Sequence, residues 1–175
     1  MERCAIAVMV CTLIARAAFA DLSAALVKDM RPGTYAGFGE GLFAPSFTEM
    51  NGRLFFLAED GINGYELWKT DGTEAGTAMV ADLTPGGAGS FIQARNVLNG
   101  SLLFAVKRSA PTLWEMWKSD STAAGTALLT NQTFSYVADD RSSFARVGDT
   151  LYFVARQSGY GIELWKRRTA PKPAR

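Results

Sequence analysis

The chain has 175 residues, 48% of them hydrophobic and 20% charged, which is an ordinary globular composition and excludes a low-complexity or disordered protein. Its 18 basic and 17 acidic side chains almost cancel, so no strong field of one sign directs it to nucleic acid or to an anionic membrane. We therefore expect one folded domain, no nucleic-acid partner, and recognition by local surfaces.

Residues 1–20 have the pattern of a secretory signal peptide. A positive start is followed by an apolar run over 4–15, and a small-x-small exit at 18–20 precedes Asp21. The run is shorter than the roughly 20 apolar residues that span a bilayer. We expect cleavage, a secreted, periplasmic or cell-surface location, and no transmembrane anchor in the mature chain.

Cleavage would remove both cysteines, Cys4 and Cys11, from a chain that has no histidine. The domain expected at 21–167 then lacks disulfides, thiol nucleophiles, zinc sites built from Cys or His, and catalytic triads that use imidazole. A domain of roughly 150 residues can be held together by its hydrophobic core alone.

Three similar segments follow, and self-similarity at a period of 20 to 50 residues indicates a modular fold. The segments are 51–83, 99–129 and 148–169, of which the last matches only the first half of the others. The shared positions are Glu66, Trp68, Asp71 and Gly76, then Glu115, Trp117, Asp120 and Gly125, then Glu163 and Trp165. The glutamates are spaced by 49 and 48 residues.

Each segment divides into short strands separated by turns. Asn51-Gly52 and Asn99-Gly100 are signals for two-residue type I′ hairpins, and Gly148-Asp149 is a weaker form of the same signal. The strands that come next, at 54–58, 102–106 and 151–155, are apolar on both faces. We expect them to be inner strands between neighbouring sheets.

The stretch 66–77, ELWKTDGTEAGT, reads as architecture rather than chemistry. Strand alternation places Glu66 and Trp68 on one face, where the indole supplies apolar area between sheets and the carboxylate accepts a hydrogen bond from the indole or a backbone amide. Asp71 suits a turn because its carboxylate can bond backbone amides two residues on, and Gly72 and Gly76 tolerate left-handed backbone.

This stretch resembles the ELWxTDGTxxGT repeat of bacterial secreted and surface proteins, sometimes labelled hyalin-like, and the resemblance covers residues 24–166. It implies an all-β fold, a β-propeller-like array of about three four-stranded antiparallel blades, and it implies no defined activity or catalytic residues. The second copy departs from the motif with Ser121 in place of the first turn glycine, and the third copy stops after ELWK.

The N-terminal segment 25–33, ALVKDMRPG, resembles the fourth-strand segment 79–87, MVADLTPGG. The N-terminal strand is therefore expected to complete the last blade. Three blades are too few for a ring, because propellers usually have four to eight. Either two chains assemble a six-bladed ring, or the chain is a fragment of a longer array, or it stands alone as an irregular stack.

Candidate sites are few. Asp60, Asn63 and Glu66 place three oxygens within seven residues, as a calcium site requires, although the equivalent loops keep only the glutamate and a solvated loop is the alternative. Asp139 and Asp140 are adjacent carboxylates, a poor arrangement for the paired acids of a glycosidase. The basic tail 168–175 contains two prolines, and we expect it to be disordered.

The function class expected from these patterns is a binding or cell-envelope interaction module for an unknown protein or glycan, with self-association of blades as a further option. The shared residues build the sheets, whereas the loops between them vary. No catalytic residue and no cofactor other than calcium is indicated. The alternatives are a glycan-processing hydrolase or lyase of the propeller type, or a non-functional fragment of a longer repeat protein.

Overall fold

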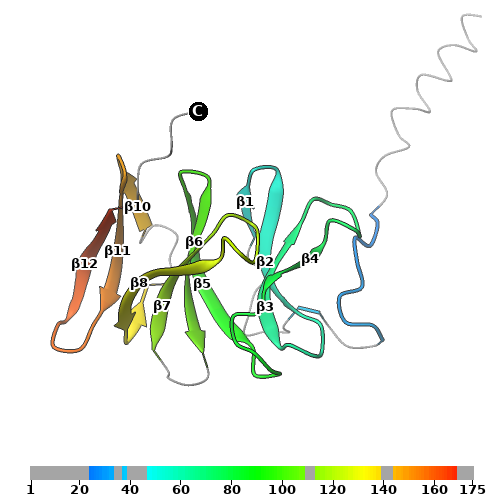
Figure 1. Ribbon diagram of the computed structural model, residues 1–175, viewed down its shortest axis with the longest axis horizontal. Helices are drawn as coiled ribbons and strands as arrows, with labels where there is room; N and C mark the ends of the chain where they lie inside the picture. The colour runs from blue at the N-terminus through cyan, green and yellow to red at the C-terminus, as the bar shows by residue number, and fades with distance from the viewer. Residues whose placement is uncertain (1–23, 34–36, 39–46, 109–112, 139–143, 169–175) are drawn as a thin grey trace, which may run out of the picture.

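The computed structural model describes residues 24–33, 37–38, 47–108, 113–138 and 144–168. These residues contain no helix and form three antiparallel sheets (Figure 1). The expectation of an all-β fold is confirmed. The described residues form an open stack of sheets, not a closed barrel or ring.

The first sheet has the order β1-β2-β3-β4 and the second β5-β6-β7-β8. In the third, β9 and β10 both pair with β11, as two pieces of one outer strand, and β12 pairs with the other side of β11. The bounds are β1 Thr48–Met50, β2 Arg53–Glu59, β3 Tyr65–Thr70, β4 Ala78–Ala81, β5 Ser90–Leu98, β6 Ser101–Arg108, β7 Trp114–Ser119, β8 Ala127–Phe134, β9 Tyr136–Val137, β10 Phe144–Val147, β11 Thr150–Arg156 and β12 Ile162–Arg168.

The hairpin turns have the backbone that the Asn-Gly pairs predict. Asn51 and Gly52 have φ of 55° and 73°, and Asn99 and Gly100 have φ of 52° and 73°, the two positive values of a type I′ turn. In the third hairpin only Gly148, at 56°, is positive. These turns fix the register in which the first two strands of each sheet pair.

The inner strand of the second sheet, β6, is buried on both faces. Leu102, Phe104 and Val106 pack in the core shared with the first sheet. Leu103 and Ala105 pack in the core shared with the third sheet. The sequence pattern of apolar residues on both faces is therefore satisfied by a sheet on either side, as Figure 1 shows for the second sheet in the middle of the stack.

The three sheets stack in the same orientation. Each places its tryptophan opposite a phenylalanine of the inner strand, in the pairs Phe56–Trp68, Phe104–Trp117 and Phe153–Trp165. We call the side of a sheet that carries this pair its tryptophan face. Trp117 packs in the core with the first sheet and Trp165 in the core with the second. The tryptophan faces of the second and third sheets thus each cover the opposite face of the sheet before them.

The tryptophan face of the first sheet is covered by the N-terminal segment. Met30 and Phe38 pack against Phe56 and Trp68. The Lys28 ammonium donates to the Thr77 carbonyl oxygen at 3.1 Å, and Arg31 forms an ion pair with Glu59.

These contacts correct the expectation that the N-terminal strand completes the last sheet of its own chain. Residues 24–33 are in no strand and lie at the first sheet, at the opposite end of the stack from the third (Figure 1). Because three sheets do not curve back on themselves, the segment covers the nearest apolar face instead.

The expected signal peptide, 1–20, lies outside the described residues. So does the expected tail, apart from Arg168, which is the last residue of β12. The charged run that begins at Lys166 therefore starts as strand rather than as a disordered end.

The turn after β3 is held by an aspartate and a threonine two residues later. Asp71 Oδ1 accepts hydrogen bonds from the amide and hydroxyl of Thr73 at 3.0 and 2.7 Å, and Asp120 does the same with Thr122 at 2.9 and 2.7 Å. The hydroxyl and amide of Thr73 lower the pKa of Asp71 in consequence. The turn geometry is thus encoded locally and occurs in both copies.

The second glycine of this turn serves a different purpose from the one expected. The backbone of Gly76 is not left-handed. A Cβ placed there would lie 1.9 Å from the Asp71 carboxylate, and at Gly125 it would lie 2.1 Å from Asp120. Glycine is required at both positions because the aspartate folds back over it.

The first turn glycine does need positive φ, which generates a test of stability. Gly72 has φ of 91°, and Ser121 occupies the equivalent position with φ of 82°. Left-handed backbone costs a non-glycine residue on the order of 1 kcal/mol or more. Ser121→Gly should therefore raise the free energy of unfolding by about 1 kcal/mol in urea titrations. The mirror control, Gly72→Ser, should lower it by a similar amount, and shifts of the same sign in both variants would contradict this account.

Candidate functional site

Glu66 is the buried carboxylate of the molecule's first sheet. It is fully buried, and its oxygens accept hydrogen bonds from the amides of Leu83 and Thr84 at 3.0 and 3.2 Å and from the Ser90 hydroxyl at 3.0 Å. Leu83 and Thr84 follow β4, and Ser90 begins β5. The carboxylate therefore ties the connection between the first two sheets to β3.

Burial raises the pKa of Glu66 to about 7. The three hydrogen bonds act against this rise, and the charge of Asp82 adds to it. No cation takes part in the hydrogen bonds that the structure shows around Glu66 in the described chain, so desolvation of the charged form is the dominant effect.

The other two motif glutamates have different partners. Glu115 accepts from the Trp117 indole N–H at 3.0 Å and pairs with Arg108 at 3.2 Å. Glu163 is exposed, and the Trp165 indole donates instead to the Ala155 carbonyl oxygen. The motif glutamate therefore binds backbone amides in the first sheet, accepts a hydrogen bond from the indole in the second, and is an exposed charge in the third.

The candidate calcium ligands are divided between two environments. Asp60 Oδ1 accepts from the amides of Ile62 and Asn63, both at 2.9 Å, and Asp60 Oδ2 accepts from the Asn63 side-chain amide at 2.7 Å. Both oxygens of Glu66 are engaged by the β4–β5 connection. The structure brings Asp60 and Asn63 together and directs Glu66 elsewhere, and calcium binding there stays a prediction that melting with and without calcium would test.

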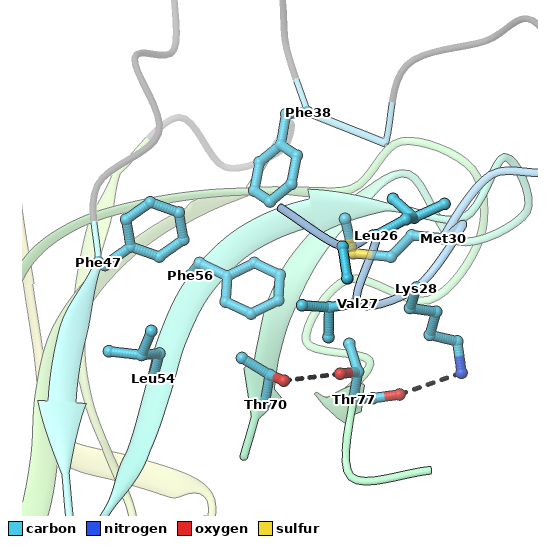
Figure 2. A pocket seen from close by; sticks show the side chains of 11 residues that line it. Leu26, Val27, Lys28, Met30, Phe38, Phe47, Leu54, Phe56, Thr70 and Thr77 are labelled. Atoms are coloured by element: carbon cyan, nitrogen blue, oxygen red, sulfur yellow. Dashed lines mark hydrogen bonds between the residues drawn. The ribbon is translucent and has the colours of Figure 1, made fainter. Parts of the chain in front are cut away.

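An apolar pocket of about 360 Å³ lies on the tryptophan face of the first sheet (Figure 2). Figure 2 shows the rings of Phe38, Phe47 and Phe56 gathered on one side of it. The ring centroids of Phe47 and Phe56 are 5.9 Å apart, and those of Phe38 and Phe56 are 5.5 Å apart. Leu26, Val27, Lys28 and Met30 of the N-terminal segment line the pocket as well, with Ala25, Leu54, Thr70 and Thr77.

The β2–β3 and β11–β12 connections, which join an inner strand to a tryptophan-bearing strand, lie at one edge of the stack, opposite the hairpin turns (Figure 1). Each of the three connections, β2–β3, β6–β7 and β11–β12, has five residues, but their sequences differ: DGING, SAPTL and QSGYG. Ile62 is 75% exposed and Tyr160 is 65% exposed, and Leu113 is also exposed. Each connection therefore presents a large apolar side chain.

The outer face of the third sheet is a second exposed apolar surface. Val147 and Leu164 are 67% and 70% exposed, and Ile162 is exposed too. Sequence reasoning missed this surface, although a signal was available. Leu164 occupies the position of Leu67, which is fully buried under the second sheet.

Asp139 and Asp140 lie outside the described residues. In the described part of the chain, no cluster of three or more Cys, His, Asp or Glu residues is arranged to hold a metal ion. The same residues contain no helix of the length and hydropathy that crossing a membrane requires.

Comparisons with protein-family models, curated proteins and solved structures find no match to this chain. Inference about function therefore rests on its own surfaces.

The raised pKa of Glu66 predicts a pH dependence of stability. Between the ordinary pKa of 4.5 and the folded value of about 7, the folded state binds more protons than the unfolded state. The free energy of unfolding should therefore fall as pH rises through this window, by up to about 3 kcal/mol. Glu66→Gln should flatten this part of the profile in urea titrations between pH 4.5 and 8.

The matched control is Glu163→Gln, at the equivalent but exposed position. It should leave the pH profile unchanged. Parallel profiles for the wild type and Glu66→Gln would show that the buried carboxyl does not carry the dependence.

Proposed function

We propose that the protein is a secreted or cell-envelope binding module, in which a propeller-like stack of sheets presents loops to a protein or glycan ligand. The observation that carries the proposal is the loop edge, defined as the β2–β3 and β11–β12 connections together with Leu113, the described residue of the β6–β7 connection. Equal length in an equivalent setting, combined with different sequence and an exposed apolar side chain in each, is typical of a recognition surface on a constant scaffold.

Two of these residues have an ordered backbone before any ligand binds. Ile62 lies in a turn in which Asp60 accepts hydrogen bonds from the backbone amides of Ile62 and Asn63. Tyr160 donates its amide to the Gln157 carbonyl oxygen at 3.0 Å, and its ring meets Trp165 edge-on at 6.0 Å. A loop that is ordered beforehand loses less conformational entropy on binding, which favours recognition by this edge.

The local chemistry favours binding over acid catalysis. The carboxylate of Asp60 is occupied by three hydrogen bonds from its own loop. The amide of Asn63 contributes most to lowering its pKa, so Asp60 is ionised at neutral pH and cannot donate a proton as a general acid.

The proposal is tested with the double variant Ile62→Ser/Tyr160→Ser. Binding would be measured to insoluble bacterial envelope material by co-sedimentation, and to an array of bacterial cell-wall glycans. We expect the wild type to bind one of these probes and the double variant to bind at least about 10-fold more weakly, since truncating the few anchor residues of an interface costs about 1 kcal/mol or more each.

The matched control is Val97→Ser, which removes an exposed apolar side chain from β5 near the hairpin edge. It should bind as the wild type does. Equal binding by the double variant would overturn the assignment of the loop edge. Turnover of a glycan that disappears in Asp60→Asn would instead establish the enzymatic alternative.

A further inference from the structure

We propose that a second copy of this chain docks the outer face of its third sheet on the tryptophan face of the first sheet, where residues 25–28 pair with the side of β12 of the second copy that has no partner strand among the described residues. This contact lies at the two ends of the stack and does not involve the loop edge. It reproduces between chains the packing that joins sheets within the chain.

The outer face of the third sheet is the first half of the argument. Leu164 is 70% exposed, whereas its counterparts Leu67 and Met116 are fully buried by the following sheet. Val147 and Tyr152 likewise correspond to Met50 and Phe55 of the first sheet, which are buried in the core shared with the second. The apolar positions of this face match positions that are buried in the first sheet, and the surface that buries them in this molecule is a tryptophan face.

The pocket on the first sheet is the complementary half. Its lining residues correspond to residues between the first and second sheets. Leu54 and Phe56 correspond to Leu102 and Phe104 of β6, and Val27 and Met30 correspond to Val80 of β4 and Leu83 after it. Those counterparts pack around Met50, Phe55 and Leu67. The corresponding occupants of the pocket are Val147, Tyr152 and Leu164 of a second copy.

The N-terminal segment resembles the fourth-strand segment of the first sheet in sequence and in backbone conformation. Residues 25–33, ALVKDMRPG, align with 78–86, AMVADLTPG, and the aligned glycines Gly33 and Gly86 have φ of 109° and 97°. Met30 packs on the first sheet's tryptophan face as Leu83 packs in the core between the first and second sheets. The segment is therefore placed where the last strand of a preceding sheet belongs.

The register of pairing follows from the two sheets that have a fourth strand. Ala78 and Met79 lie opposite Lys69 and Trp68, and Ala127 and Leu128 lie opposite Lys118 and Trp117. By the same rule Ala25 and Leu26 lie opposite Lys166 and Trp165 of the second copy. This register gives Leu26, which is 81% exposed, a tryptophan to cover.

A lysine fixes the orientation of the contact. Lys69 reaches from the first sheet to donate to the Ser121 carbonyl oxygen of the second sheet at 2.6 Å. Its counterpart Lys166 would donate to the Gly72 carbonyl oxygen of the other copy. Pairing two third sheets directly would instead bring Arg156, Lys166 and Arg168 of both copies together, because alternation places all three on this face, and like charges disfavour that arrangement.

Copies joined head to tail form a closed ring when the rotations from one copy to the next add up to a full turn. Two copies supply six sheets, within the four to eight that propeller rings contain. The expected species is therefore a closed pair with two identical contacts.

The test is the mass of the purified full chain in solution, measured by sedimentation over a range of concentrations. The wild type should sediment as a pair. Leu164→Asp and Leu26→Asp should each be monomeric, with association weakened at least about 100-fold, because each places a charge in an apolar contact. Both residues are exposed in the single chain, so neither variant should change its melting temperature as a monomer.

Mixing the two variants identifies the geometry. Leu164→Asp keeps an intact first sheet and Leu26→Asp keeps an intact third sheet, so an equimolar mixture should form a pair with one good contact. Ile62→Asp, an equally exposed apolar position at the loop edge, is the control and should associate as the wild type does.

Several outcomes would overturn the proposal. A wild type that is monomeric at all concentrations would do so, as would a pair that survives Leu164→Asp. Normal pairing of Leu26→Asp would indicate direct contact between two third sheets, and growth into longer oligomers would exclude closure by two copies. Ligand binding by the loop edge is unaffected by Leu26→Asp, so the two proposals can fail separately.

Discussion

The packing of one sheet's tryptophan face on the opposite face of the sheet before it is the interaction on which the structure depends. Each such interface buries aromatic and branched side chains, at roughly 25 cal/mol for each Å² of apolar surface removed from water. The second sheet satisfies both of its faces in this way. In the part of the chain that the structure describes, the sheets at the two ends are each covered by another sheet on one face only, so the molecule has two surfaces with apolar positions that match those of an interior. The N-terminal segment covers one of them in part, with Met30 and Phe38 in place of a whole sheet.

The strands and hairpins could be predicted from the sequence because their causes are local. Asn51-Gly52 dictates its turn through the backbone that the two residues tolerate, and alternation correctly puts Glu66 and Trp68 on one face. The partners of Glu66 could not be predicted, since Leu83, Thr84 and Ser90 come from a connection whose path depends on the second sheet. The role of Gly76 was also hidden, because the constraint is the approach of another side chain and not the backbone angle.

The candidate functional surfaces, too, could be predicted only where their causes are local in the sequence. Variation among the three loops is visible in the sequence, but that each presents one exposed apolar side chain at one edge requires the stacking. Proximity in sequence suggested that Asp60, Asn63 and Glu66 act together, whereas strand direction sends Glu66 into the molecule and leaves Asp60 to order its own loop. The exposed Leu164 is the reverse case, since its resemblance to Leu67 predicts burial and only the end of the stack leaves it in water.

An open stack with matching ends, and with a strand side that no described strand occupies, can associate without limit, and the charges of β12 oppose this. Lys166, Arg167 and Arg168 end this strand, and basic residues on an exposed edge strand oppose its pairing with another copy of itself. They oppose residues 25–28 less, because the small side chain of Ala25 would lie opposite Lys166, as Ala78 lies opposite Lys69, and the one basic residue of the segment, Lys28, would lie opposite Leu164. The basic residues of β12 therefore disfavour a second β12 as the partner strand more than they disfavour residues 25–28. Specificity at the ends of the stack comes from register and charge, while the apolar faces supply the driving force.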